Sequence, residues 1–346
     1  MPDDTAPTPP HQRRVRYRGK NPRRFADKYK ERDPVRFAET VAKVVASGKT
    51  PAGTHRSIMV AEMMQILSPQ PGEVAVDCTL GYGGHAQEIL ARLCPGGRLL
   101  GLDADPIELP KTEARLRALG FGPEIFTAHR SNFAGLQQLL TQHEIAGADV
   151  ILVDLGVSSM QIDNPARGFS VKQDGPLDMR MNPLRGQSAS ALLRSIRPAK
   201  LAALLSSNAD EPYADILAPV LAGGDFATTT ALASAIRGAL TRVPKEASDL
   251  SVRRVFQALR IEVNDEFSAL DTFLRDLPEC LNPGGRVAVL TFHSGEDRRV
   301  KKSFAHGLRE KLYGEIAADV IRPTATECHS NPRATAAKLR WARRAS

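Results

Sequence analysis

The chain has 346 residues, more than the ~100–200 of a typical domain, so we expect one large domain with an insertion or two domains. With 42% hydrophobic and 25% charged residues the composition is globular, and no apolar run reaches the ~20 residues of a membrane-spanning helix. The four cysteines include no CxxC pair and are too sparse for a disulfide framework. These features exclude a fibre, a coiled-coil rod and a disulfide-rich miniprotein. We expect a soluble, cytoplasmic protein without a metal cluster.

The net charge of +8 is concentrated near the N-terminus. Residues 11–36 contain eleven Lys or Arg and three acidic residues, whereas the other 320 residues contain 36 of each sign. Because Tyr17, Phe25 and Tyr29 are interleaved with these cations, we interpret residues 1–50 as a basic arm that contacts RNA phosphates and stacks on occasional bases. A solvated, disordered terminus is an equal alternative. The segment lacks the apolar stretch of a secretory signal.

Short apolar runs that end in acidic or glycine residues alternate with helical patterns along the chain. In chain order we expect a helix at 54–67, a strand at 74–76, a helix through 89–93, a strand ending at Asp103, a helix through Leu119, strands within 124–133 and 148–159, a helix at 264–281 and a strand within 283–294. The run at 150–153 is continuously apolar, which indicates a strand buried on both faces. This alternation predicts an α/β fold with a doubly wound parallel sheet, whose ligands bind beyond the carboxyl ends of the strands.

The segment between the fourth and fifth strands is too long for a loop, since structureless connections beyond ~15 residues are uncommon in compact domains. It contains apolar helical patterns at 189–196, 199–205, 213–221 and 229–240. We interpret residues 161–261 as an inserted helical subdomain that recognises the substrate. Residues 51–160 and 262–346 would then form the domain that contains the sheet.

A glycine-rich loop follows the first strand and leads into a helix, where glycines let the backbone approach a ligand closely. Its candidate cofactor contacts are Asp77, Gly81, Gly83, Gly84 and His85. Asp103 ends the next strand, where an acid can accept hydrogen bonds from ribose hydroxyls. The glycines could alternatively form only a turn, and His85 could cap or pack its helix.

Two cofactors fit this loop. Gly81, Gly83 and Ala86 satisfy the spacing of a dinucleotide fingerprint, so NAD stays open. Asp77 and Asp154, which end the first and fourth strands, favour S-adenosylmethionine instead. A pyrophosphate would be repelled by both carboxylates, whereas the ammonium group of a methionine moiety would be attracted to Asp77.

Polar clusters also follow the fourth and fifth strands. The first consists of Asp154, Ser158, Ser159 and Gln161, and the second lies at 292–298 and includes His293. Polar residues after a strand are ordinary turn material. Because the carboxyl ends of parallel strands meet at one edge of a sheet, however, the two clusters and the glycine loop are expected to form one site.

Six segments carry a resemblance to a known family. They are, in order, DCTLGYGGHA, LDADP, VDLGVSSMQIDNPARGFSVKQDGPLDMRMNPLRGQSA, VFQALRIEVNDE, GGRVAVLTFHSGEDRRVK and NPRATAAKLR. From about His55 to Arg340 the chain resembles the ribosomal small-subunit methyltransferase H family, also called MraW. The resemblance implies a Rossmann-like class I methyltransferase sheet. It also implies that S-adenosylmethionine serves to methylate N4 of a cytidine in the decoding centre of 16S rRNA.

The resemblance further implies particular cofactor contacts. Matched residue by residue, these are Gly83, Gly84 and His85 in the loop, Asp103 at the ribose, Phe133 beside the adenine, and Asp154 and Gln161 near the methionine end. The chain departs from the family at Tyr82, where Arg is usual, at Gly295, where Leu is usual, and at 249–254. These departures concern the substrate more than the cofactor.

Cytosine N4 is a weak nucleophile, because its lone pair is conjugated with the ring. An enzyme must align it with the methyl group and accept the proton that it loses. We expect Asp154 to be this acceptor, supported by Ser158, Ser159 and His293. The expected partner is 16S rRNA or the small ribosomal subunit, without a membrane, and the sequence is compatible with a homodimer. Two other functions stay open: a non-catalytic RNA-binding protein with a vestigial cofactor fold, and an NAD-dependent enzyme.

Overall fold

The computed structural model describes residues 57–346, so the basic arm predicted at 1–50 lies outside the described residues. Within them, seven strands form one sheet in the order β3-β2-β1-β4-β5-β7-β6. They are β1 (Val74–Asp77), β2 (Arg98–Asp103), β3 (Phe126–Arg130), β4 (Ala148–Asp154), β5 (Leu281–Thr291), β6 (Tyr313–Ile316) and β7 (Lys338–Arg344). The first five strands are parallel, and β7 runs antiparallel to its neighbours β5 and β6.

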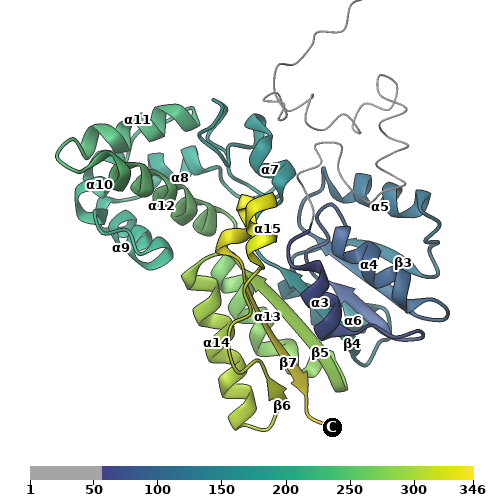
Figure 1. Ribbon diagram of the computed structural model, residues 1–346. Coiled ribbons are helices and arrows are strands. Elements are labelled where there is room, and N and C mark those ends of the chain that lie inside the picture. The colour runs from purple at the N-terminus through teal and green to yellow at the C-terminus, as the bar shows by residue number, and fades with distance from the viewer. Residues whose placement is uncertain (1–56) are drawn as a thin grey trace, which may run out of the picture.

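Helices cover both faces of the sheet (Figure 1). One layer consists of α3 (Val60–Leu67), α4 (Gly84–Leu93) and α5 (Leu109–Ala118), and the other of α6 (Leu136–Gln142), α13 (Glu266–Cys280) and α14 (Ser294–Arg309). Along β4, Val150 and Leu152 pack into the first layer, whereas Ile151 and Val153 pack into the second. This alternation confirms the strand buried on both faces and the doubly wound α/β sheet.

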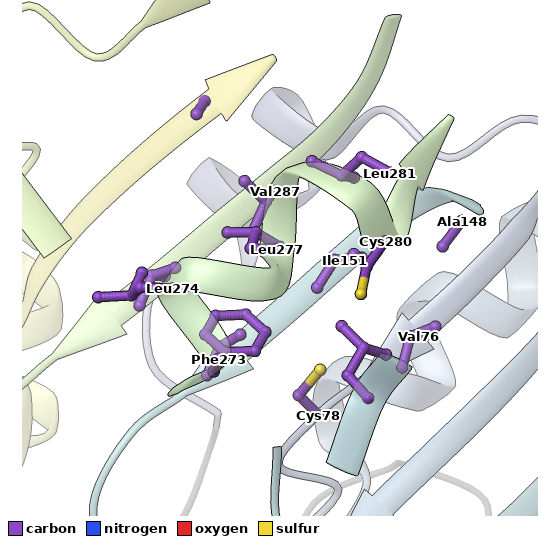
Figure 2. Packing of buried hydrophobic residues seen from close by; sticks show 14 of the residues in the cluster. Val76, Cys78, Ala148, Ile151, Phe273, Leu274, Leu277, Cys280, Leu281 and Val287 are labelled. Carbon is purple, nitrogen blue, oxygen red and sulfur yellow. The ribbon is translucent and has the colours of Figure 1, made fainter. Parts of the chain in front are cut away.

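The second layer is anchored by α13. Figure 2 shows Phe273, Leu277 and Cys280 of this helix in the same buried cluster as Ile151 of β4 and Val287 of β5. Because α13 leads directly into β5, its packing fixes the central strands whose carboxyl ends carry the polar clusters.

Five helices between β4 and β5 form a separate bundle, seen to one side of the sheet in Figure 1. They are α8 (Ala189–Ser195), α9 (Pro198–Ala209), α10 (Ala214–Leu221), α11 (Thr229–Ala239) and α12 (Lys245–Val263). Buried side chains from all five make a hydrophobic cluster of their own. The first four helices match the predicted apolar patterns, while α12 was not predicted and extends past the proposed boundary at 261.

The C-terminal part of the chain contains further elements that were not predicted. β6 and β7 complete one edge of the sheet, and two short helices lie between them, α15 (Ala325–Ser330) and η4 (Pro332–Ala336). The carboxylate of Glu327 accepts from the Met59 backbone at 2.8 Å, and Arg333 donates to Asp163 at 2.7 Å. Asp163 ends α7 (Ser159–Asp163), so the C-terminal segment joins the region before β1 to the region after β4. No helix in residues 57–346 combines the length and apolar character needed to cross a membrane.

Candidate active site

A cavity of about 1650 Å³ opens at the carboxyl ends of β1, β2 and β4. The predicted residues that line it are Gly81, Gly83, Gly84, His85, Asp103, Phe133, Asp154, Ser158, Ser159 and Gln161. Asp77 lies beneath the loop and is 1% exposed, and neither it nor His293 lines the cavity. Phe133 begins the short helix η2 (Phe133–Gly135), where its ring stands edge-on to Phe273 at 5.8 Å. The structure therefore brings most of the predicted residues together.

The glycine loop is held by the acid that ends β2. The Gly81 N–H donates to Asp103 at 2.7 Å, and the Gly81 carbonyl accepts from Thr112 at 2.5 Å. Gly81 has a φ of 50°, in the left-handed region that favours glycine, and little surrounds the position where a side chain would begin. A ligand can therefore approach this backbone closely.

The next two glycines lie close to neighbouring side chains. A Cβ on Gly83 would lie 2.9 Å from atoms of Thr112 and Arg115, and one on Gly84 would clash with Ser57. Gly83 is also the N-cap of α4, and no side chain caps this helix among the described residues. The first N–H groups of α4 thus stay available at the cavity to an anionic group of a ligand.

The ends of β1 and β4 are tied together beneath the loop. Asp77 accepts from the Thr79 backbone at 3.1 Å, and the Thr79 hydroxyl accepts from the Asp154 backbone at 2.6 Å. Because Asp77 is buried and bonded to its own loop, it supports the site from below. Asp154 ends a buried strand and is held in place by its backbone, which leaves its carboxylate at the cavity.

These carboxylates share an electrostatic environment that resists ionisation. Burial raises the pKa of Asp103 to about 6, that of Asp77 to about 7 and that of Asp154 to about 8. Repulsion adds to the effect, since Asp77 is close to Asp103, and Asp154 is close to both Asp77 and Glu296. A positively charged ligand would stabilise the ionised forms, and a negatively charged ligand would oppose them.

His85 is buried in the first turn of α4. Its Nε2 atom lies 3.0 Å from the Ile58 carbonyl oxygen, which can only accept, so Nε2 carries the hydrogen. Burial lowers the pKa of the imidazole to about 4, and the ring is neutral at physiological pH. The remaining ring nitrogen is an acceptor that faces Asp154.

Ser158 and Gln161 build the first turn of α7. The Ser158 hydroxyl accepts from the Gln161 backbone at 3.2 Å, and the Gln161 side chain accepts from the Ser158 backbone at 2.9 Å. The Gln161 amide also donates to Asp105 at 2.9 Å. Most of the hydrogen-bonding capacity of Gln161 is therefore used within the protein.

A buried ion pair that was not predicted lies behind α7. Arg167 and Asp105 approach to 2.7 Å with their side chains 7% and 1% exposed. The other Arg167 nitrogen donates to the carbonyls of Arg180 and Met181 at 3.0 and 2.8 Å. The pair fixes the chain after α7 to the end of β2. Asp105 lies in the LDADP segment, but nothing in the sequence links it to an arginine so far along the chain.

The cluster after β5 is organised around Glu296, which is 3% exposed. Its carboxylate accepts from the Phe292 backbone at 2.8 Å, and lies 3.0 Å from the His293 ring and 3.9 Å from Arg260. Although burial opposes it, the His293 contact and the Arg260 charge lower the pKa of Glu296. The His293 ring caps α14 rather than facing the cavity. Arg260 lines the cavity and makes a bidentate pair with Glu266 at 2.8 and 2.9 Å.

At two of the positions that depart from the family pattern, Tyr82 and Gly295, the residue present packs against its neighbours. The Arg115 guanidinium stacks over the Tyr82 ring at 4.2 Å and donates to the Tyr82 carbonyl. A Cβ on Gly295 would lie 2.6 Å from Phe267, so the larger residue that is usual there would displace this ring. Neither change removes a predicted cofactor contact.

A doubly wound sheet with a glycine loop after β1 and acids at the ends of β1, β2 and β4 is the arrangement expected of a Rossmann-like methyltransferase. A family model described as the MraW methylase family matches residues 52–345. The chain belongs to this family, which decides against the NAD-dependent alternative. No group of three or more His, Cys, Asp or Glu in residues 57–346 is arranged to hold a metal ion.

Curated relatives cover nearly the whole chain. It is 50% identical to "Ribosomal RNA small subunit methyltransferase H 1" of Lachnoclostridium phytofermentans, over 96% of this chain and 93% of the relative. It is 51% identical to "Ribosomal RNA small subunit methyltransferase H 2" of Alkaliphilus metalliredigens, over 96% and 97% of the two chains. Among solved structures, TrmN from Thermus thermophilus has a TM-score of 0.40 at 13% identity, covering 89% of this chain and 52% of that one.

Proposed function

We propose that the protein uses S-adenosylmethionine to methylate N4 of a cytidine in the decoding centre of 16S rRNA, in the cytoplasm. Membership of the MraW methylase family supports methyl transfer, and the names of the relatives support small-subunit rRNA as the substrate. The observation that carries the proposal is Asp154, a carboxylate that ends a buried strand and lines the cavity beside the glycine loop. A carboxylate in this position is suited to receive the proton of an attacking amine.

The residues around the loop fit S-adenosylmethionine. Asp103 accepts one backbone bond on each carboxylate oxygen and keeps lone pairs for ribose hydroxyls. The uncapped start of α4 offers N–H groups to the cofactor carboxylate. Phe133 would lie beside the adenine. When ionised, Asp77 and Asp154 would attract a positively charged ligand and repel a pyrophosphate. When bound, the cofactor supplies a methyl group on a positively charged sulfur.

The cavity has room for more than a cofactor. Its volume of about 1650 Å³ exceeds the ~300–1,000 Å³ of a typical small-molecule site. A cytidine in a stacked or paired strand must swing out of its neighbours to reach an enclosed pocket. Phe292, which lines the cavity, offers an aromatic face on which the base can stack.

The residues after β4 would orient the amine and receive its proton. The Thr79 hydroxyl fixes the Asp154 backbone, so the acceptor is preorganised before the substrate arrives. Ser158 uses its oxygen to cap α7 but keeps its O–H, and Ser159 follows it at the cavity. His293 would act through Glu296, which adds negative charge near Asp154.

Nucleoside mass spectrometry of 16S rRNA tests the proposal. RNA from cells that lack the protein should lose N4-methylcytidine, and the wild-type gene should restore it. A gene carrying Asp154→Asn should not, whereas Asp271→Asn, which changes an exposed carboxylate, should restore the modification fully. An unchanged N4-methylcytidine content would refute the proposal. Cofactor binding without methyl transfer would support the non-catalytic RNA-binding alternative.

A further inference from the structure

Helix α14 carries a stripe of basic side chains on its outer face. Arg298, Lys301, Lys302, His306 and Arg309 are all exposed, and their spacing of three, four, eight and eleven residues from Arg298 puts them on one side of the helix. At 1.5 Å per residue the stripe is about 16 Å long. The same side chains border a shallow depression of about 560 Å³.

The acidic residues of α14 do not neutralise the stripe, because both are engaged elsewhere. Glu296 is 3% exposed and bonded to the backbone that precedes the helix. Asp297 is bound by Lys338 at 3.2 Å and by Arg340 at 2.7 Å, on β7. The outer face of the helix is therefore positive along its length.

Neighbouring elements contribute little compensating charge. Asp210 lies 3.9 Å from Arg298, and Glu310 lies 4.0 Å from His306. Both contacts are solvent-exposed, and exposed ion pairs of this kind are weak. Within residues 57–346, the remaining cations of the stripe, Lys301, Lys302 and Arg309, have no ion-pair partner.

The N-terminal end of α14 lies at the cavity. Phe292 and Glu296, at the start of α14, line the cavity, and Figure 1 shows α14 continuing from there along the outer edge of the molecule. A polymer with one unit in the cavity would therefore pass the first turn of α14, from which the stripe extends along the outer face of the helix.

We propose that the α14 stripe binds the phosphate backbone of the RNA strand that flanks the target nucleotide. Lysines and arginines without acidic partners bind phosphates by releasing counterions, which adds affinity and no sequence readout. The inference rests on the proposed RNA substrate. The proposed docking surface consists of residues 298–309, so it involves other residues than the N-terminal basic segment.

The experiment compares two triple variants of the full chain. Lys301→Ala, Lys302→Ala and Arg309→Ala together remove the unpaired part of the stripe. Arg92→Ala, Arg98→Ala and Arg275→Ala remove the same net charge from exposed positions on α4, β2 and α13. Affinity for naked small-subunit RNA is measured over a range of salt concentrations, together with cofactor affinity and the methylation rate at saturating RNA.

We expect the stripe variant to lower the slope of log affinity against log salt by about two, at ~0.7 per lost contact to a single strand. The slope of the matched variant should stay closer to the wild-type slope than that of the stripe variant. Both variants should keep the wild-type cofactor affinity and the wild-type methylation rate at saturating RNA. Equal slopes for the stripe variant and the wild type would overturn the inference. So would a stripe variant that binds naked RNA normally but loses the assembled subunit, since the stripe would then contact a subunit protein.

The outcomes also separate this inference from the proposed function. A lowered slope in a protein that forms no N4-methylcytidine would leave the docking surface standing while the proposed function failed. Normal formation of N4-methylcytidine with an unchanged slope for the stripe variant would support the proposed function and overturn the docking surface.

Discussion

The Nδ1 atom of His85 lies 3.7 Å from a carboxylate oxygen of Asp154. Because Nε2 donates to the Ile58 carbonyl, Nδ1 presents a lone pair, and two acceptors face each other across a gap too long for a direct hydrogen bond. In the ligand-free protein the raised pKa of Asp154 eases this opposition by keeping the carboxyl protonated at neutral pH. When a positively charged ligand stabilises the ionised form of Asp154, an N–H group beside both atoms would find an acceptor on either side. This is the arrangement that an amine substrate requires.

Asp154→Asn should therefore slow methyl transfer by about 100-fold or more, the range of general-base contributions. The amide keeps the shape of the side chain but cannot receive a proton. The measurement is single-turnover methylation of small-subunit RNA at saturating cofactor, with cofactor affinity determined alongside. A wild-type rate combined with poor cofactor binding would make Asp154 a cofactor ligand only. The acceptor would then have to be sought among Ser158, Ser159 and His293.

The same variant should change how stability depends on pH. The pKa of Asp154 is about 8 in the folded protein against 3.8 for the unperturbed group, so the folded state holds a proton that the unfolded state releases between these values. This difference in proton binding lowers the stability of the wild type progressively as pH rises from about 4 to 8. Asp154→Asn has no titrating group at this position and does not lose stability in this way. In thermal unfolding without ligand, the Tm of the variant relative to that of the wild type should therefore increase from pH 5 to pH 8. A constant difference in Tm would contradict the raised pKa.

Asp103→Ala should weaken binding of S-adenosylhomocysteine by roughly 1–3 kcal/mol, the scale for leaving buried polar groups unpaired. The carboxylate also holds the Gly81 and Asp105 backbones, so Asp103→Asn, which keeps the shape and one acceptor, should lose less. Calorimetry measures both, with thermal unfolding to verify the fold. Unchanged affinity in the alanine variant would remove Asp103 from the cofactor site.

Asp105→Asn should destabilise the protein by about 3–5 kcal/mol, because it leaves the charge of Arg167 buried without its partner. Glu88→Gln is the matched control, since it breaks the exposed pair with Arg92 and should cost no more than about 1 kcal/mol. Urea unfolding gives both values from the shift in midpoint at constant slope. Equal losses would mean that the buried pair contributes nothing beyond a surface contact.

Deleting residues 1–36 should lower RNA affinity and flatten its salt dependence without moving the site of methylation. The segment includes residues 11–36, with eleven Lys or Arg against three acidic residues, and has no base-reading geometry of its own. The slope of affinity against salt, and the position of the methylated nucleotide, are the two readouts. A truncated chain with the wild-type slope would refute this prediction.

The sequence predicted those features that depend on short stretches of chain. Strand ends at Asp77, Asp103 and Asp154 follow from apolar runs that stop at an acid, and their convergence follows from parallel pairing. β7 was missed because four of its seven residues are Lys or Arg, and pairing with β5 and β6 decides its conformation. The helix α12 was missed because its charged residues dilute the apolar stripe that packs on the bundle.

Side-chain partnerships between distant segments could not be predicted. His293 was expected to face Asp154 across the cleft, but Glu296 three residues later completes a capping box with it and turns the ring toward α14. Arg260 lies in a segment that resembles the family but was not predicted as a site residue. Its place at the cavity depends on Glu266 and Glu296. Burial and pairing of this kind arise from the assembled fold and leave no periodic pattern.

Arg167 and Arg260 also decide how the helices between β4 and β5 could be exchanged between relatives. A chimera that replaced residues 161–261 would take both arginines from the donor. A donor without them would leave the carboxylates of Asp105 and Glu266 without their partner charges. A graft confined to residues 189–239, from α8 to α11, would leave both guanidinium groups with their native partners. Such a graft would therefore test whether α8 to α11 influence RNA preference in a protein that keeps both ion pairs.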